Sequence, residues 1–363
     1  MVQPLTIGTR EDGLARAQAE LFMEQLREYE PPYPVHLELV RPSQDRAIAV
    51  HVDHIAENRR NIQLLHHILR EGDCDVVIHR GFDLRDKLPP DLAIAAIPRR
   101  CSPYDALLSP SGLTLDELEP GTPVGVVQLR ARVQMLQYRH DLDWTLMSGD
   151  VATWLADLLD QKIEALVMPN AAIEQLGLQE RVSEIFPADL VIPAPCSGIL
   201  VCVTRRDDEL ARERLSCIHH KATAREYAAE RSMMDALGCE WDSPVAALAQ
   251  SKGRRLLLLG MVADTDGYRL IREGVEGKSS EAVEVGEAVA EFLSHGLAQS
   301  AQDWEGEELP ESEMGADEIE DELTALLLAT NLDDQGDDFA ESDNEDDEEE
   351  VDPDDFEEED FLE

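Results

Sequence analysis

Short apolar runs alternate with helical patterns through the first two hundred residues, and this alternation restricts the fold more than any other feature. Runs such as "VVIH" (76–79) and "VGVV" (124–127) are nearly continuous in apolar residues, which is typical of strands buried on both faces. Segments such as "NIQLLHHILREG" (61–72) and "VATWLADLLDQ" (151–161) have helical spacing. The alternation predicts an α/β fold with largely parallel sheets, in which ligands bind beyond the carboxyl ends of the strands.

The pattern changes near residue 216, where the regular alternation stops. A helical stretch over 224–238 is followed by "RRLLLLGMVADTDGYRLIREGV" (254–275), which predicts a β-hairpin that turns at residues 264–267. We therefore expect a small α+β domain that ends near residue 300.

Charge is distributed unevenly along the 363 residues, whose net charge is −47. Residues 303–363 contain 31 acidic residues and no Lys or Arg, whereas the first 302 residues carry a net charge of −16. An acidic body of this kind argues against binding of nucleic acid. The tail is predicted to be mostly disordered, with a short amphipathic helix over 317–327, and a basic protein is the partner that its charge would attract.

The cysteine pattern and the apolar runs indicate the compartment. Six cysteines form no CxxC pair, which favours a reducing environment and argues against a structural zinc site. The first residues lack the features of a signal peptide, and the run "LLLLGMV" (256–262) is too short to span a bilayer. We expect a cytoplasmic protein without membrane association. The pairs His66-His67 and His219-His220 are weak candidates for metal binding, and a plain surface or interface role is predicted for them.

The buried strand over 76–78 leads into "HRGFD" and so to Asp83. An aspartate at a strand end ordinarily caps a turn or the next helix. Its place in the chain alone therefore does not give Asp83 a catalytic role.

Three stretches together resemble the porphobilinogen deaminase family, also called hydroxymethylbilane synthase. "IGTREDGLARAQA" (7–19) is similar to the family's "IGTRxSxLAxxQA", and "DVVIHRGFDLRDKLPPDLAIAAIPRR" (75–100) to "DxAVHSxKDLPxxLPxxLxIAAIPxR". "VGVVQLRARVQ" (124–134) is similar to "VGTSSLRRxAQ". Shorter matches include "PAPCSGILV" (193–201), "AER" (229–231) and "GCEWDSPVAA" (238–247), and the likeness runs in unbroken order from residue 4 to about 300.

The resemblance implies two doubly wound α/β domains of the kind seen in periplasmic binding proteins, followed by the small α+β domain. With it, we expect domain 1 to comprise residues 1–99 and 196–214, domain 2 residues 100–195, and domain 3 residues 215–302. The acidic tail then covers residues 303–363.

The resemblance also implies a chemistry and a set of site residues. Members of the family carry a dipyrromethane cofactor on a cysteine, here Cys239, and extend it with porphobilinogen units. The family's catalytic aspartate corresponds to Asp83, whose carboxylate would hold pyrrole N–H groups and stabilise the cation formed as ammonia leaves. The expected cofactor-binding residues, besides Cys239, are Arg10, Gln128, Arg130 and Arg181. We further expect a monomer without a metal ion.

Several basic positions of the family are replaced in this chain. The family lysine before the aspartate is Phe82, the serine of "IGTRxS" is Asp12, and the second arginine of "SLRR" is Ala131. Ser148 and Trp154 stand where two further arginines are expected. Because each charge-assisted hydrogen bond to a substrate carboxylate contributes on the order of 1.5–3 kcal/mol, these losses predict impaired turnover.

Two readings of the function therefore stay open. The first is a hydroxymethylbilane synthase of altered activity, favoured by the presence of both Cys239 and Asp83. The second is a catalytically inactive protein of the same fold that acts as a scaffold through its acidic tail, favoured by the missing arginines. A thiol such as Cys239 is more often a packing residue than a nucleophile. A periplasmic solute-binding protein is disfavoured because no signal peptide is expected.

Overall fold

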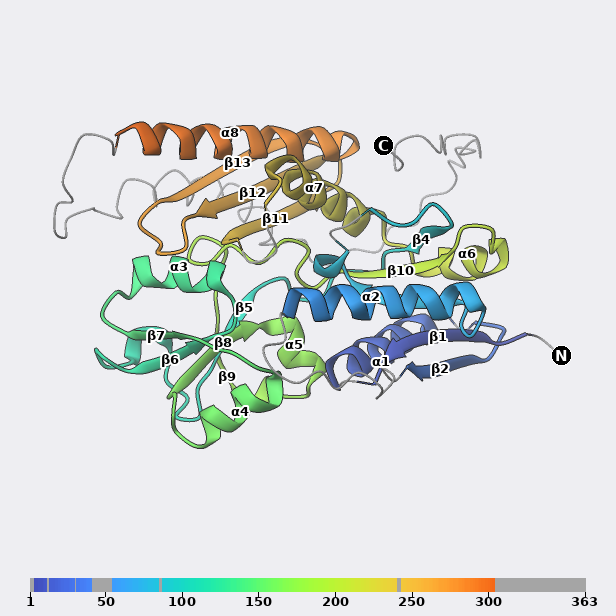
Figure 1. Ribbon diagram of the computed structural model, residues 1–363, viewed down its shortest axis with the longest axis horizontal. Coiled ribbons are helices and arrows are strands. Elements are labelled where there is room, and N and C mark those ends of the chain that lie inside the picture. The colour runs from blue at the N-terminus through green and yellow to red at the C-terminus, as the bar shows by residue number, and fades with distance from the viewer. Residues whose placement is uncertain are drawn as a thin grey trace, which may run out of the picture.

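The computed structural model describes residues 3–11, 13–29, 31–40, 54–84, 87–239 and 243–303. These residues form two five-stranded sheets and one three-stranded sheet, with helices packed on their faces (Figure 1). The predicted tail helix and almost all of the acidic tail lie outside the described residues.

The first sheet has the strand order β2-β1-β3-β10-β4. Its strands are β1 (Leu5–Arg10), β2 (Val35–Val40), β3 (Val76–Arg80), β4 (Leu92–Ala96) and β10 (Leu200–Arg205). The helices that accompany it are α1 (Gly13–Arg27), α2 (His54–Glu71) and α6 (Glu209–Leu215). Strand β10 runs antiparallel to both of its neighbours, while β2, β1 and β3 are parallel to one another.

Strand β3 is buried on both faces because consecutive side chains enter different hydrophobic cores. Val76 and Ile78 pack with Phe22 of α1 on one face, whereas Val77 packs with Leu69 of α2 on the other. The continuous apolar run in the sequence is therefore the consequence of a sheet covered on both sides.

The second sheet has the order β7-β6-β8-β5-β9 and repeats this arrangement. Its strands are β5 (Asp105–Leu108), β6 (Pro123–Val126), β7 (Asp143–Leu146), β8 (Ala165–Pro169) and β9 (Val182–Ile185). Its helices are α3 (Leu129–Tyr138), α4 (Val151–Leu159) and α5 (Asn170–Gln175). Strand β5 alternates in the same way, since Leu107 packs on the α3 side and Leu108 on the side of α4 and α5.

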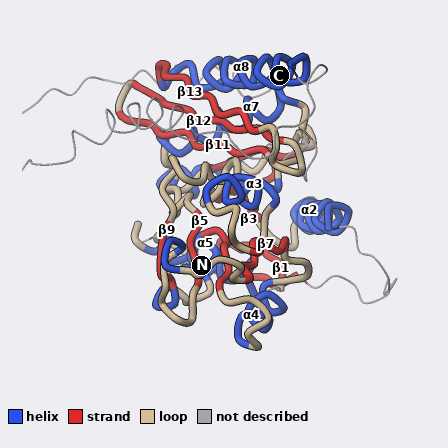
Figure 2. Tube along the Cα trace, turned by 90° about the vertical axis from the view of Figure 1, so that its left-hand side faces the viewer, coloured by secondary structure: helices blue, strands red, loops and turns tan. Residues whose placement is uncertain are grey.

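The third sheet, β11-β12-β13, forms a separate layer at one end of the molecule together with two long helices (Figure 2). The elements are α7 (Lys221–Leu237), β11 (Val245–Lys252), β12 (Arg255–Ala263), β13 (Leu270–Lys278) and α8 (Ala282–Asp303). One face of β12 packs on α7 and α8 through Leu258, and the other contacts Val133 of α3 through the cluster that holds Leu257. The third sheet therefore packs against α3, the helix that accompanies the second sheet.

These observations confirm the predicted fold class: two α/β sheets covered by helices, and a small α+β unit after residue 216. The expectation of largely parallel sheets is wrong, because β10 pairs antiparallel with β3 and β4, and β5 pairs antiparallel with β8 and β9. The predicted hairpin is also confirmed, since β12 and β13 pair antiparallel and Gly267 adopts a φ of +80° in the turn between them. Strand β10 lies in the first sheet although it follows the whole second sheet in the chain. The proposed boundaries at residues 99, 195, 214 and 302 stay a prediction.

Candidate active site

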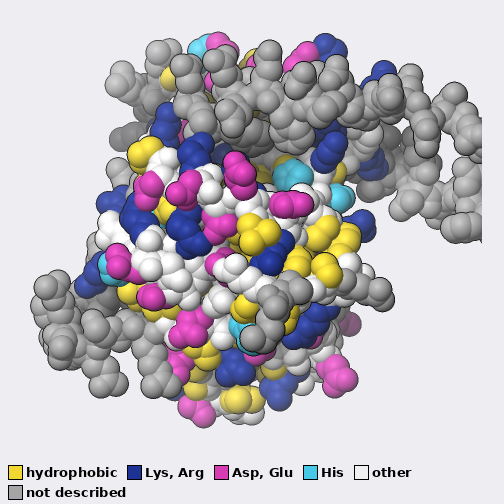
Figure 3. All heavy atoms as spheres, turned by 90° about the vertical axis from the view of Figure 1, so that its right-hand side faces the viewer, with side chains coloured by type: hydrophobic (Ala, Val, Ile, Leu, Met, Phe, Trp, Pro, Cys, Tyr) yellow, Lys and Arg dark blue, Asp and Glu magenta, His cyan; other side chains and the backbone are white. Residues whose placement is uncertain are grey.

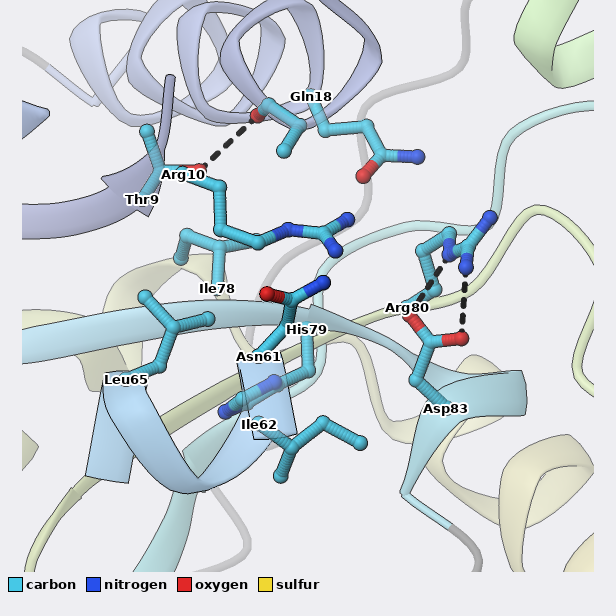
Figure 4. A pocket seen from close by; sticks show the side chains of 11 residues that line it. Thr9, Arg10, Gln18, Asn61, Ile62, Leu65, Ile78, His79, Arg80 and Asp83 are labelled. Carbon is cyan, nitrogen blue, oxygen red and sulfur yellow. Dashed lines mark hydrogen bonds and ion pairs between the residues drawn. The ribbon is translucent and has the colours of Figure 1, made fainter. Parts of the chain in front are cut away.

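A small hollow lies at the carboxyl ends of β1 and β3, which are parallel neighbours in the first sheet. We call it the Asp83 pocket; its empty volume is about 300 Å³. Its polar lining residues are Thr9, Arg10, Gln18, Asn61, His79, Arg80 and Asp83. Figure 4 shows Arg10 reaching between Gln18 and Asn61, toward the side where Arg80 and Asp83 lie. The hollow is therefore at the sheet edge where an α/β fold places its ligands.

Asp83 is positioned by a 3-10 turn, Gly81–Asp83, that begins directly after β3. Its carboxylate receives a fork of two hydrogen bonds from Arg80, both of 2.7 Å, one from Nε to Oδ2 and one from Nη2 to Oδ1. The Asp83 side chain is 7% exposed and the Arg80 side chain 39% exposed. The buried carboxylate is thus paired with a cation that reaches solvent.

Two buried histidines lie beneath the pocket. His79 of β3 and His66 of α2 meet edge to face, with ring centroids 5.1 Å apart, and each Nε2 lacks a hydrogen-bond partner in the described chain. Burial lowers the pKa of His79 to about 3, an effect opposed by the charge of Asp83, and burial lowers the pKa of His66 to about 4. Both rings are therefore neutral at pH 7. Of the surface or interface role predicted for this pair, the surface part does not apply to His66, because α2 turns it toward the sheet, whereas His67 beside it is exposed.

A larger cleft adjoins the Asp83 pocket and lies between the first and second sheets. We call it the interlobe cleft; its empty volume is about 550 Å³. Arg80 and Gln18 line both hollows, so the two are neighbours that share these side chains as part of their walls. The first-sheet side also contributes Phe82, and the second-sheet side contributes Gln128 and the start of α5.

The structure brings together three of the predicted site residues. Asp83 and Arg10 line the Asp83 pocket, and Gln128, which precedes α3, lines the interlobe cleft. Arg130 lies behind Gln128 and is 4% exposed. Its guanidinium pairs with Asp105 at 2.6 Å and donates to the Gln128 side chain at 2.7 Å, so it is already held by protein partners.

The other two predicted residues lie elsewhere. Arg181 is exposed at the end of a short 3-10 turn and lines neither of the two hollows as described. Cys239 follows Gly238, which ends α7 in the left-handed conformation, and packs against the core of the third sheet. Its thiol is partly buried, with Sγ 3.9 Å from the Leu237 carbonyl oxygen. All six cysteines fall within the described residues, and none forms a disulfide.

The positions where the family has arginines are filled by other contacts. The indole N–H of Trp154 donates to the carbonyl oxygen of Ser148 at 3.0 Å, so the two replaced positions are bonded to each other. Ala131 is buried in the core beneath α3. Asp12 lies outside the described residues.

Arg80 is not among the site residues predicted from the sequence, although the structure joins it to Asp83. The available signal was its spacing, since Arg80 and Asp83 are three residues apart at the point where the family motif has a serine in place of Arg80. His79 was likewise passed over. A polar residue at the end of an otherwise apolar strand was the signal that could have drawn attention to it.

Other kinds of site find little support in the described part of the chain. No group of three or more His, Cys, Asp or Glu side chains there is arranged to hold a metal ion. None of the described helices combines the length and the apolar character needed to cross a membrane. On the face shown in Figure 3, Lys and Arg side chains lie among Asp and Glu side chains.

Two α/β lobes with a cleft between them, and a small α+β unit that packs against both lobes, define the class of this protein. Within that class its family is shown by sequence comparison. Residues 5–213 match the model for the porphobilinogen deaminase, dipyromethane cofactor binding domain, and residues 224–295 match the model for the porphobilinogen deaminase C-terminal domain. The chain belongs to the porphobilinogen deaminase family.

Curated relatives agree with this assignment. Porphobilinogen deaminase of Roseiflexus sp. (strain RS-1) is 33% identical over 293 residues, which cover 81% of this chain and 96% of that protein. The enzyme of Geobacter sulfurreducens is 31% identical over 291 residues, covering 80% and 91%. Among solved structures, a methionine-binding protein covers 63% of this chain and 94% of its own at 16% identity, with a TM-score of 0.38. A similarity that low supports no conclusion about this chain.

Proposed function

We propose that this chain is a hydroxymethylbilane synthase-type deaminase, a transferase that polymerises porphobilinogen in tetrapyrrole and heme biosynthesis, with impaired turnover. The observation that carries the proposal is the buried carboxylate of Asp83, which a 3-10 turn presents at the carboxyl end of β3 in the Asp83 pocket. Family membership supplies the reaction class, and the placement of Asp83 supports it. We further infer that the protein is a cytoplasmic monomer.

The proposed chemistry needs one negative charge that faces a developing positive one. When porphobilinogen loses ammonia, its C–N bond breaks and the remaining pyrrole becomes an azafulvene cation. In the proposal, Asp83 accepts a hydrogen bond from the pyrrole N–H and stabilises this cation electrostatically. Arg10, which lines the same pocket, is proposed to bind the acetate or propionate carboxylate of the substrate.

The residues present fit a dipyrromethane in chemical type. Cys239 offers a partly buried thiol directly after Gly238, and the left-handed φ of +60° at Gly238 turns the chain away from α7. The bound group supplies the end to which new pyrroles are added. Arg10 and Gln128 are proposed to hold its polar groups, together with Arg130 and Arg181 after rearrangement of their present contacts.

Impaired turnover is proposed because few cations line the two hollows. Among their described lining residues only Arg10 and Arg80 carry a positive charge, since burial keeps His79 neutral. A chain of pyrroles brings many carboxylates into such a cleft. Each missing charge-assisted contact removes on the order of 1.5–3 kcal/mol of binding free energy.

The second candidate function is a catalytically inactive scaffold that binds a basic protein through the acidic tail. The contacts of two replaced positions favour it, because the Trp154–Ser148 hydrogen bond leaves a tryptophan where the family binds substrate with arginine. The burial of Arg130 against Asp105 points the same way. The two candidates differ in whether Cys239 becomes modified.

Intact-mass spectrometry tests the proposal on protein made in a host that produces porphobilinogen. We expect an added mass equal to one dipyrromethane, which gives the colour reaction of a pyrrole with a free α-position in acidic aldehyde reagent. The addition should be absent in Cys239→Ser and present in Cys217→Ser, the control at an exposed cysteine. An unmodified mass, even after incubation with excess porphobilinogen, supports the scaffold instead.

A further inference from the structure

Arg80 occupies the boundary between the two hollows of the site. It is the last residue of β3 and has extended backbone angles, φ −73° and ψ 139°, just before the 3-10 turn that holds Asp83. From there its side chain reaches across the turn to both carboxylate oxygens of Asp83. Because Arg80 also lines the interlobe cleft, a ligand in that cleft lies within reach of the guanidinium.

The pairing changes the electrostatics of the site. An Arg–carboxylate fork has no net charge, so Asp83 in this arrangement offers a developing cation much less stabilisation than an unpaired carboxylate would. The negative charge of Asp83 is already neutralised by this pairing. Catalysis by Asp83 therefore requires that Arg80 turn to another partner at the right moment.

The two partners differ in how firmly they are held. Asp83 is almost fully buried on a tight turn, whereas 39% of the Arg80 side chain is exposed on a long and flexible stem. The substrate supplies the alternative anion, since each pyrrole carries carboxylates. Moving the guanidinium from one carboxylate to another keeps a charge-assisted fork throughout and so avoids the cost of an unpaired buried charge.

We propose that Arg80 is an exchanging counter-ion of the active site, which pairs with Asp83 before substrate binds and with a substrate carboxylate afterwards. Binding then unmasks the Asp83 charge at the moment when the pyrrole arrives. In this role Arg80 replaces the lysine of the family, whose position is Phe82 in this chain. The proposal rests on the proposed function, because it takes porphobilinogen as the ligand.

The first test separates KM from kcat. Arg80→Gln removes the contact to the substrate carboxylate, and we expect KM for porphobilinogen to rise about tenfold or more, with kcat changed less than about threefold. Arg80→Lys keeps the charge and should give an intermediate KM. A kcat that rises in Arg80→Gln while KM stays unchanged would show that Arg80 only inhibits Asp83, which overturns the exchange.

The matched control is a second forked pair outside the site. Arg70 donates to both oxygens of Asp91, and its side chain is 40% exposed, nearly the same as Arg80. Neither Arg70 nor Asp91 is among the described lining residues of the two hollows. Arg70→Gln should leave KM unchanged, and a KM rise equal to that of Arg80→Gln would count against a specific role for Arg80.

A binding measurement tests the exchange without turnover. Calorimetric titration with porphobilinogen should show weaker binding in Arg80→Gln but binding tighter by about threefold or more in Asp83→Asn, because the competing carboxylate is gone while the amide oxygen still accepts N–H. Asp91→Asn is the control. Weaker or unchanged binding in Asp83→Asn overturns the proposal. Both variants could show these changes in affinity while the wild-type protein lacks both modification and turnover. In that case the proposed function fails and the counter-ion role stands.

Discussion

His79 and Arg80 are adjacent in the chain, yet their side chains meet opposite environments because successive side chains of a strand point to opposite faces. His79 lies on the same face as Val77, toward α2, and there it meets the ring of His66. Arg80 reaches the cleft and pairs with Asp83. A shift of one residue in the register of β3 would turn the His79 side chain away from α2 and the Arg80 side chain away from the cleft.

The buried histidine pair predicts a stability that falls on acidification. Burial lowers the pKa of His66 to about 4 in the folded protein, below its ordinary value of 6.5. Between these two pH values the unfolded chain binds more protons, so the free energy of unfolding decreases as the pH falls, by up to about 1.4 kcal/mol per pH unit for each such histidine. We expect His66→Leu to lose less stability than the wild type between pH 7 and 4.5.

Chemical denaturation across this pH range measures the difference between the two proteins. His140→Gln provides the control, a substitution of the same residue type at an exposed position away from the buried pair. Parallel curves for wild type and His66→Leu would contradict the prediction.

At the scale of elements, the 3-10 turn after β3 depends on a residue without a side chain. A Cβ added at Gly81 would lie 2.9 Å from the Cys196 Cβ and 3.2 Å from the Tyr227 ring. Cys196 itself has a φ of +59°, a conformation that is rare for residues other than glycine. The backbone at Cys196 can therefore shift little to make room for a larger side chain at Gly81. Close packing of these two segments sets where Asp83 stands.

Gly81→Ala should therefore destabilise the protein by about 1–3 kcal/mol through overpacking. Gly13→Ala is the control, because nothing lies within 4 Å of a Cβ at that position, and it should be neutral or stabilising by up to about 1 kcal/mol. Urea denaturation of both variants measures the effect. Equal stabilities for the two variants would mean that the turn shifts freely.

At the scale of the whole molecule, Glu230 of α7 ties the three sheets together. Its carboxylate accepts hydrogen bonds from Arg100, which follows β4, at 2.6 Å, and from the Ala249 N–H of β11 at 2.7 Å. It also accepts one from the Cys196 N–H, in the segment that returns from the second sheet to β10. The Glu230 side chain is fully buried, and the Arg100 side chain is 8% exposed.

Glu230→Gln should lower the free energy of unfolding by about 3 kcal/mol, because the buried guanidinium of Arg100 then keeps only the more distant carboxylate of Glu226, 3.7 Å away. Thermal unfolding measured by circular dichroism reports the loss, and Glu213→Gln on the exposed surface of α6 is the control. A melting temperature unchanged from wild type would show that Arg100 finds another anion, with nearby Glu226 the first to examine.

Local patterns in the sequence were sufficient for the fold class, the hairpin and the position of Asp83 at a strand end. The reason is that burial on one or both faces of an element leaves a periodic trace in the residues of that element. Resemblance to the family added the expected role of Asp83 and Cys239. Those roles stay predictions until the modification of Cys239 is measured.

The partners of individual polar groups, by contrast, were decided only by the tertiary structure. Arg130 meets Asp105 from another strand, and His66 meets His79 from another element, so no periodic pattern in either segment records the pair. Even Arg80 and Asp83, three residues apart, pair only because a 3-10 turn, packed tightly against Cys196, brings the two side chains together. The sequence by itself determined which elements form, since the burial of each element sets the spacing of apolar residues within that element. The tertiary structure decided which charges meet, since that depends on how distant elements pack.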